Sequence, residues 1–323
     1  LVVAAGALVL TGAVAWLGLW MGGYDPARAA GALLGGSLGG RDALLSVTLV
    51  RSVPLVLTGL AVALAFRAGV WNIGAEGQLY AGALFAVWVG LEGGALPSWV
   101  LVPAVLLAAA VGGAVWALVP ALMRIRLGVG EVITTILMNF VGLYAAAYAV
   151  HGPLQEARGV FPQTDPIAES ARLPMLVPGT RLHAGFLLAV LGAAVLWAFM
   201  RWTRAGFAVR AVGASPGAAR VAGRFDDRRI VTMAFLGSGA VAGLAGGVEI
   251  AGVTYALSAP VFLNMTFPSM QGALAWLPGC LLAIEGTARL SGPWRTTGWF
   301  LLGAVSHAMV VLSGHPELAF LVF

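Results

Sequence analysis

The sequence is dominated by apolar runs that are about as long as a lipid bilayer is thick. A helix that crosses the bilayer needs about 20 mostly apolar residues. Only 10% of the 323 residues are charged, whereas a soluble chain carries about 25%. We therefore expect an all-α, polytopic membrane helical bundle of about nine or ten transmembrane helices, forming a single domain over residues 1–323. The nine segments that we predict to span are 1–22, 46–66, 72–92, 98–121, 129–150, 184–202, 230–256, 266–286 and 297–313.

The first and last apolar runs depart from this pattern. Residues 1–22 lack the basic start and the small-residue cleavage site of a signal peptide, so we interpret them as a membrane helix. The run over residues 309–323 is broken by Gly314 and Pro316, and it could hold part of a tenth span.

All 18 basic residues are arginines, and their positions predict an orientation. Cytoplasmic loops carry an excess of basic residues. With the N-terminus in the cytoplasm, twelve arginines fall on the cytoplasmic side and five on the opposite side, while Arg51 lies inside a span. Because this bias alternates through all nine spans, we expect a multi-pass protein with a cytoplasmic N-terminus.

Two loops are long for membrane connections. Residues 151–183 contain five prolines and lie on the extracytoplasmic side in this topology. Residues 201–229 form the most basic segment, and they lie on the cytoplasmic side. Within them, Ser215 and Pro216 are typical of a helix start, and Gly223 is typical of a helix end. The pattern predicts a short, exposed helix on which another protein docks, and a merely solvated basic loop is the alternative.

A polar cluster interrupts the start of the span at residues 72–92. Asn72, Glu76 and Gln78 lie among Gly69, Gly74 and Gly77, and glycines at this density weaken a helix. Discontinuous helices mark substrate sites in transporters. The alternative, which we consider equally, is an interfacial helix start with Glu76 near the lipid headgroups.

Further polar residues lie in later spans. Glu131, Thr135 and Asn139 are four residues apart, so they share one helical face that must point into the bundle. They are candidates for the substrate path, with interhelical hydrogen bonding as the alternative. Glu249 is another candidate, and it follows glycines at 239, 243 and 247 whose spacing favours close helix packing.

The sequence contains no recognisable catalytic or metal-binding pattern. The four histidines are scattered, and none has the spacing of a metal pair. A phosphate-binding P-loop needs a lysine, and the chain contains none. We therefore expect neither an enzyme nor a cofactor or metal in this chain.

Four segments in order resemble one family of membrane proteins. They read LTGLAVALAFRAGVWNIGAEGQLYAGA, GEVITTILMNFVGLYAAAYAVHGPLQE, FPQTDPIAESARLP and TRAGFAVRAVGASPGAARVAGRF. Together they resemble the permease subunits of ABC importers for nucleosides and simple sugars, which are related to the ribose and branched-chain amino-acid permeases. The resemblance extends from about residue 57 to residue 225, and it is lost after about residue 261.

The resemblance implies a permease subunit in the inner or plasma membrane of a prokaryote. It implies a second permease, identical or different, two ATPase subunits that bind ATP and Mg²⁺, and an extracytoplasmic substrate-binding protein. It places Asn72, Glu76 and Gln78 near the translocation path. It also implies a helix that couples to the ATPase and contains Gly213, Ser215, Pro216, Ala218, Ala219, Arg220 and Gly223.

Three functions follow from these features as hypotheses. The first is an ABC importer permease that carries a small polar solute, favoured as a nucleoside by resemblance alone, through ATP-driven alternating access. The second is a secondary transporter or channel, for which Glu131 and Glu249 would be the ion-site candidates. The third, an intramembrane enzyme, lacks a catalytic cluster in the sequence.

Overall fold

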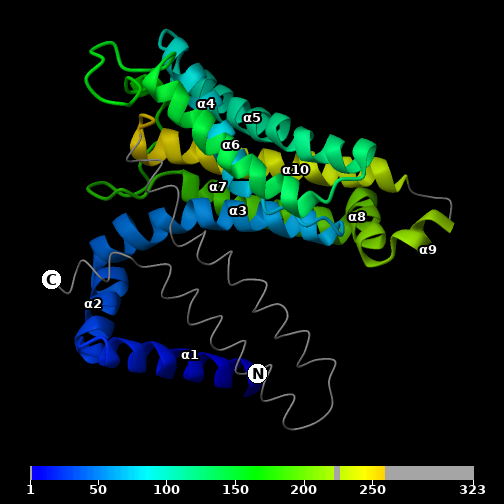
Figure 1. Ribbon diagram of the computed structural model, residues 1–323. Coiled ribbons are helices and arrows are strands. Elements are labelled where there is room, and N and C mark those ends of the chain that lie inside the picture. Colours follow the sequence, from blue (N-terminus) through cyan, green and yellow to red (C-terminus); the bar gives the residue numbers. More distant parts are fainter. Residues whose placement is uncertain (1, 222–225, 259–323) are drawn as a thin grey trace. The chain divides into compact units, whose positions relative to one another are not determined.

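The computed structural model describes residues 2–221 and 226–258 (Figure 1). The described residues divide into two compact units, one containing residues 2–40 and the other residues 41–221 and 226–258. Apart from two isolated bridges, the regular structure of the described residues is helical. This confirms the predicted all-α class. The predicted spans 266–286 and 297–313, and any tenth span, lie outside the described residues.

The first unit holds α1 (Val2–Met21) and α2 (Pro26–Leu38). The apolar part of α1 was predicted as a span, whereas α2 was not predicted. Its start is fixed by Asp25, whose Oδ1 accepts hydrogen bonds from the backbone of Ala27 at 2.9 Å and of Arg28 at 3.2 Å. An acidic N-cap followed by proline is a standard helix start, so the signal was present in the sequence.

The second unit contains the remaining described helices. In chain order they are η1 (Ala43–Thr48), α3 (Leu49–Arg67), α4 (Ala75–Glu92), α5 (Ser98–Leu127), α6 (Glu131–His151), η2 (Glu169–Ala171), α7 (Gly185–Trp202), α8 (Arg204–Ala214), α9 (Pro216–Val221), α10 (Asp227–Glu249) and η3 (Ile250–Thr254).

Five helical stretches in the described residues are long and apolar enough to cross a membrane: Ala43–Arg67, Ser98–Leu127, Glu131–His151, Gly185–Trp202 and Asp227–Thr254. Each coincides with a predicted span. The predicted span 72–92 also forms a helix, α4, but its polar start keeps it out of this group. Within residues 2–40, Val9–Met21 forms a shorter apolar helical stretch.

The long helices of the second unit alternate in direction between two ends (Figure 1). At one end, the segment after α3 meets α8, because a Cβ on Gly69 would lie 3.3 Å from the Cα of Gly213. We call this the arginine end, since it holds Arg67, Arg124, Arg126, Arg201, Arg204 and Arg210. At the other end, Ala168 N donates to Gly90 O at 3.1 Å. We call it the loop end, and it holds residues 152–184.

Glycines bring three helices of the second unit into backbone contact. α10 packs against α3, α4 and α5. A Cβ on Gly113 of α5 would overlap the carbonyl of Gly239, and one on Gly82 of α4 would overlap the carbonyl of Gly243. Close approach of this kind is how helices associate in lipid. The packing interpretation of the glycines in residues 239–247 is therefore confirmed.

Candidate functional site

The helical backbone is interrupted next to the polar cluster predicted at the start of α4. α3 ends at Arg67, and α4 begins only at Ala75. Gly69 has a φ of +72°, a left-handed conformation that glycine adopts readily. Residues 70–74 are non-helical, and Val70 and Asn72 are fully buried. A buried, irregular segment needs partners for its backbone groups, and the neighbouring side chains provide them.

Asn72 is the centre of a buried amide network. It exchanges two hydrogen bonds with Gln78, each 3.1 Å long. Its Nδ2 also donates to the hydroxyl of Ser238 at 2.8 Å, and its Oδ1 accepts from Gly74 N at 3.0 Å. Ser238 in turn donates to Ala61 O at 2.7 Å. The network therefore ties the break to α10 and α3, and all hydrogen-bonding positions of the Asn72 amide are used.

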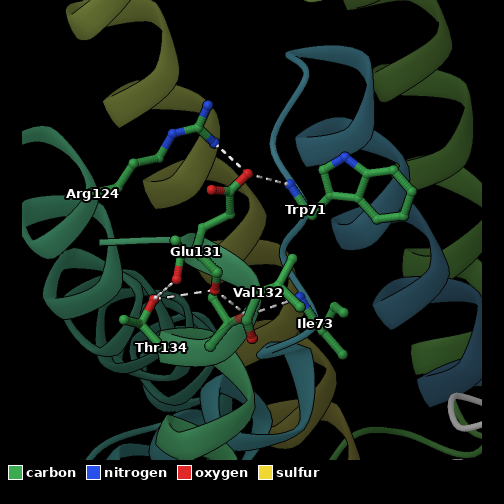
Figure 2. Close-up of polar contacts among 8 residues, drawn as sticks. Trp71, Ile73, Arg124, Glu131, Val132 and Thr134 are labelled. Carbon is green, nitrogen blue, oxygen red and sulfur yellow. Dashed lines mark hydrogen bonds and ion pairs between the residues drawn. The ribbon is translucent and has the colours of Figure 1, made fainter. Parts of the chain in front are cut away.

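The face of α6 that was predicted to be polar points at the break. Glu131 accepts from Arg124 Nη1 at 2.7 Å, forming an ion pair, and from the Trp71 backbone at 3.4 Å (Figure 2). One turn later, the hydroxyl oxygen of Thr135 accepts a hydrogen bond of 3.3 Å from the backbone N–H of Ile73. The α6 face thus binds the irregular backbone of residues 71–73.

Asn139 completes this face by bridging the broken turn. Its Oδ1 accepts from Gly77 N at 2.8 Å, and its Nδ2 donates to Ile73 O at 2.9 Å. In a continuous helix, Gly77 N would donate to Ile73 O directly, because they are four residues apart. The side-chain amide of Asn139 takes the place of that missing backbone bond.

The other two acidic candidates lie in different settings. Glu76 is buried, and its Oε1 accepts from the Tyr80 hydroxyl at 2.8 Å, so it does not lie at a lipid-facing surface. Glu249 is half-buried at the C-terminus of α10. It is eleven residues beyond Ser238, a rise of about 16 Å along the helix. The structure therefore gathers six of the seven candidates around the break and leaves Glu249 toward the loop end.

The predicted helix in the basic loop begins where expected. α9 starts at Pro216, and Ala219 N donates to Ser215 O at 3.0 Å. Gly223 lies outside the described residues. Sequence reasoning missed α8, the longer helix before it, although Thr203 is an N-cap whose hydroxyl accepts from Gly206 N at 2.9 Å. The loop is thus more ordered than predicted.

The helices α8 and α9 pack against the ends of the spanning helices. Gly213 has no room for a side chain, since a Cβ there would overlap the carbonyl of Arg67. A buried apolar cluster then joins these helices to the rest of the arginine end. It consists of Ala65, Ala68, Val70, Ala121, Val209, Val212, Ala219, Val231, Ala234 and Phe235. Since Val70 opens the break, the basic loop and the break share one packed cluster.

Two residues of the site were not singled out from the sequence. Ser238 is the partner of Asn72 from α10, and Arg124 is the partner of Glu131 from α5. The only signal for Ser238 was a lone hydroxyl in a glycine-rich span. Within the ranges 2–221 and 226–258, no cluster of three or more His, Cys, Asp or Glu residues could hold a metal ion.

One buried histidine lies apart from these groups. His183 is next to the start of α7, and its Nδ1 accepts from Gly185 N at 3.2 Å. Its Nε2 is buried without a hydrogen-bond partner among the described residues. Gly252 of η3 leaves room for the ring, because a Cβ there would overlap it. Burial lowers the pKa of His183 to about 4, so the ring is neutral at physiological pH.

The chain is similar to known transport proteins. Residues 44–267 match the family described as "Branched-chain amino acid transport system / permease component". A glucose ABC transporter permease protein of Haloferax volcanii is 42% identical over 238 residues, covering 71% of this chain and 62% of the relative. A guanosine ABC transporter permease protein of Bacillus subtilis is 37% identical over 276 residues, covering 83% and 77%.

A third relative, a nucleoside ABC transporter permease protein of Lactococcus lactis, is 30% identical over 234 residues. That match covers 70% of this chain and 64% of the relative. The chain thus spans less than two thirds of the length of the glucose and nucleoside permeases. No solved structure matches the chain. The family match over residues 44–267 and the relatives together show that this chain belongs to the permease family of the branched-chain amino acid transport systems, as an ABC transporter permease.

Proposed function

We propose that the chain forms the membrane path of an ABC importer and carries a small polar solute, most specifically a nucleoside, by ATP-driven alternating access. Two of its relatives are named as permeases for guanosine and for nucleosides. A simple sugar is the second candidate, because another relative is named as a glucose permease. Neutral, polar solutes of both classes suit amide and hydroxyl groups.

The observation that carries this proposal is the packed cluster shared by the basic loop and the helix break. Val209, Val212 and Ala219 of the loop contact the same cluster as Val70 and Phe235. A displacement of α9 is therefore transmitted to the break, because the side chains between them are close-packed. In the proposed mechanism, partner ATPases move α9, and the break and its flanking helices change their packing in response.

The partners follow from the family. We propose two ATPase subunits that bind ATP and Mg²⁺, a second permease subunit, and an extracytoplasmic substrate-binding protein. The arginine end faces the cytoplasm of a prokaryotic cell in this proposal, because basic residues favour that side. The N-terminus is then cytoplasmic too. The coupling surface comprises Gly213, Ser215, Pro216, Ala218, Ala219, Arg220 and Gly223.

Charge reversal on α9 tests the coupling. Changing Arg220→Glu is expected to abolish ATP-driven uptake and co-purification of the ATPase. Arg158→Glu is the control, since it reverses the same charge at the loop end. It should retain the ATPase. Intact ATP-driven uptake in the α9 variant would refute the coupling, and uptake driven by an ion gradient without ATP would favour a secondary transporter.

We further propose that the break lies beside the solute path. The candidates are Asn72, Glu76, Gln78, Glu131, Thr135, Asn139 and Glu249. Changing Asn72→Ala together with Gln78→Ala should lower transport while the complex still assembles. Gln155→Ala, at the exposed loop end, is the control and should transport normally. Unchanged transport in the double variant would remove this amide pair from the path.

A further inference from the structure

An apolar groove opens at the arginine end. It has a volume of about 320 Å³ and lies between α3, α7 and α8. Its walls are apolar side chains, among them Leu60 and Leu64 of α3 and Leu196 and Met200 of α7. Because both α3 and α7 belong to long apolar stretches, the groove runs along helices that contact lipid.

Three arginines also line this groove. They are Arg67 at the end of α3, Arg201 at the end of α7 and Arg210 on α8. All three are exposed, and none of the described residues that line the groove is acidic. Arg124 and Arg172 do form ion pairs, with Glu131 and Glu169. The groove therefore combines an apolar interior with three arginines that have no acidic partner among the described residues.

Aromatic side chains mark the depth of the groove in the membrane. Trp197, which lines the groove, and Trp202 are 59% and 71% exposed. Their rings lie edge to face with centroids 4.8 Å apart. Exposed tryptophans of membrane proteins gather at the level of the lipid headgroups. The arginines beside them are thus at the height where lipid phosphates lie.

We propose that this groove binds an anionic phospholipid of the leaflet at the arginine end. An acyl chain occupies the apolar interior, and the phosphate is held by Arg67, Arg201 and Arg210. Arginine suits this task because its planar guanidinium stays charged and pairs with phosphate through two parallel hydrogen bonds. Basic pockets between spanning helices are a known setting for anionic headgroups. A neutral lipid or an apolar protein helix would leave the three charges uncompensated.

The test is native mass spectrometry of the purified transporter from bilayers that mix phosphatidylglycerol with phosphatidylethanolamine. The variant changes Arg67, Arg201 and Arg210 to Gln. A basic side chain near an anionic surface contributes about a fivefold gain in affinity, so the variant should retain phosphatidylglycerol about 100-fold more weakly. The control changes Arg126, Arg228 and Arg229 to Gln, which removes the same charge from the same end but outside the groove. It should retain the lipid as the wild type does.

A second variant, Ala193→Trp, fills the groove and leaves its charges in place. It should also lose phosphatidylglycerol, since the acyl chain has no room. Equal retention by the groove variant and its control would overturn the proposal, and so would equal retention of the two lipids by the wild type. Loss of a protein subunit in Ala193→Trp, with lipid retained, would show that a polypeptide covers the groove and would overturn it as well.

Discussion

The bridging role of Asn139 can be tested by changing it to leucine, which is similar in size but cannot hydrogen-bond. The substitution removes the partners of Gly77 N and Ile73 O, which lie 2.8 and 2.9 Å from the amide. A buried backbone group without a partner costs about 1–3 kcal/mol. The two groups together give about 2–6 kcal/mol, and the added apolar surface of leucine offsets roughly 1–2 kcal/mol. We therefore expect a loss of about 1–4 kcal/mol in the free energy of unfolding.

Equilibrium unfolding in mixed micelles with increasing SDS, followed by circular dichroism, measures this loss. Thr134→Val is the matched control on the same helix. Its hydroxyl donates to carbonyls of the preceding turn, those of Gly130 at 3.4 Å and Glu131 at 3.1 Å. Valine has nearly the same shape, so the control should cost less than about 1 kcal/mol. A loss below about 0.5 kcal/mol for Asn139→Leu, or one equal to the control, would contradict the bridging role.

Two further predictions concern packing and pH. Gly243→Ala should destabilise the protein by about 1–3 kcal/mol, because its Cβ would overlap the backbone of α5. Gly59→Ala is the control, because it lies on an open surface of α3, and it should be neutral or stabilising. If both variants were half unfolded at the same SDS concentration, the close crossing of the helices would be refuted. For His183, the pKa of about 4 lies below the ordinary value of 6.5. The unfolded chain therefore binds a proton that the folded protein does not, and stability should fall as the pH drops from 6.5 toward 4, by up to about 1.4 kcal/mol per unit. His183→Gln should flatten this slope, and an unchanged slope would show that another group is responsible.

The spans could be predicted because the bilayer imposes a length that the apolar runs display directly. The shared face of Glu131, Thr135 and Asn139 could also be predicted, because the helical period fixes it. What these side chains bind could not. The sequence does not say which segment lies opposite α6, so the backbone of residues 71–77 could not be recognised as their partner.

Other features were missed for different reasons. Ser238 gave little signal, since a single serine in a span usually bonds to its own helix, whereas this one joins Asn72 to Ala61. The helices α2 and α8 begin at capping residues, Asp25 and Thr203. Such caps are easily overlooked in a sequence that consists mainly of apolar runs. Short polar helices therefore need to be sought from their caps.

The glycine crossings of α10 have a consequence for how this permease can move. Where backbones touch, one helix cannot slide or turn past another without lifting off it, because no flexible side chain lies between them. α4, α5 and α10 meet in this way at Gly82, Gly113 and Gly243. We expect these three helices to move as one rigid body. The rearrangements of a transport cycle would then take place between this rigid body and the helices around it, among them α7, which buries only 11% of its spanning stretch against the rest of the described protein.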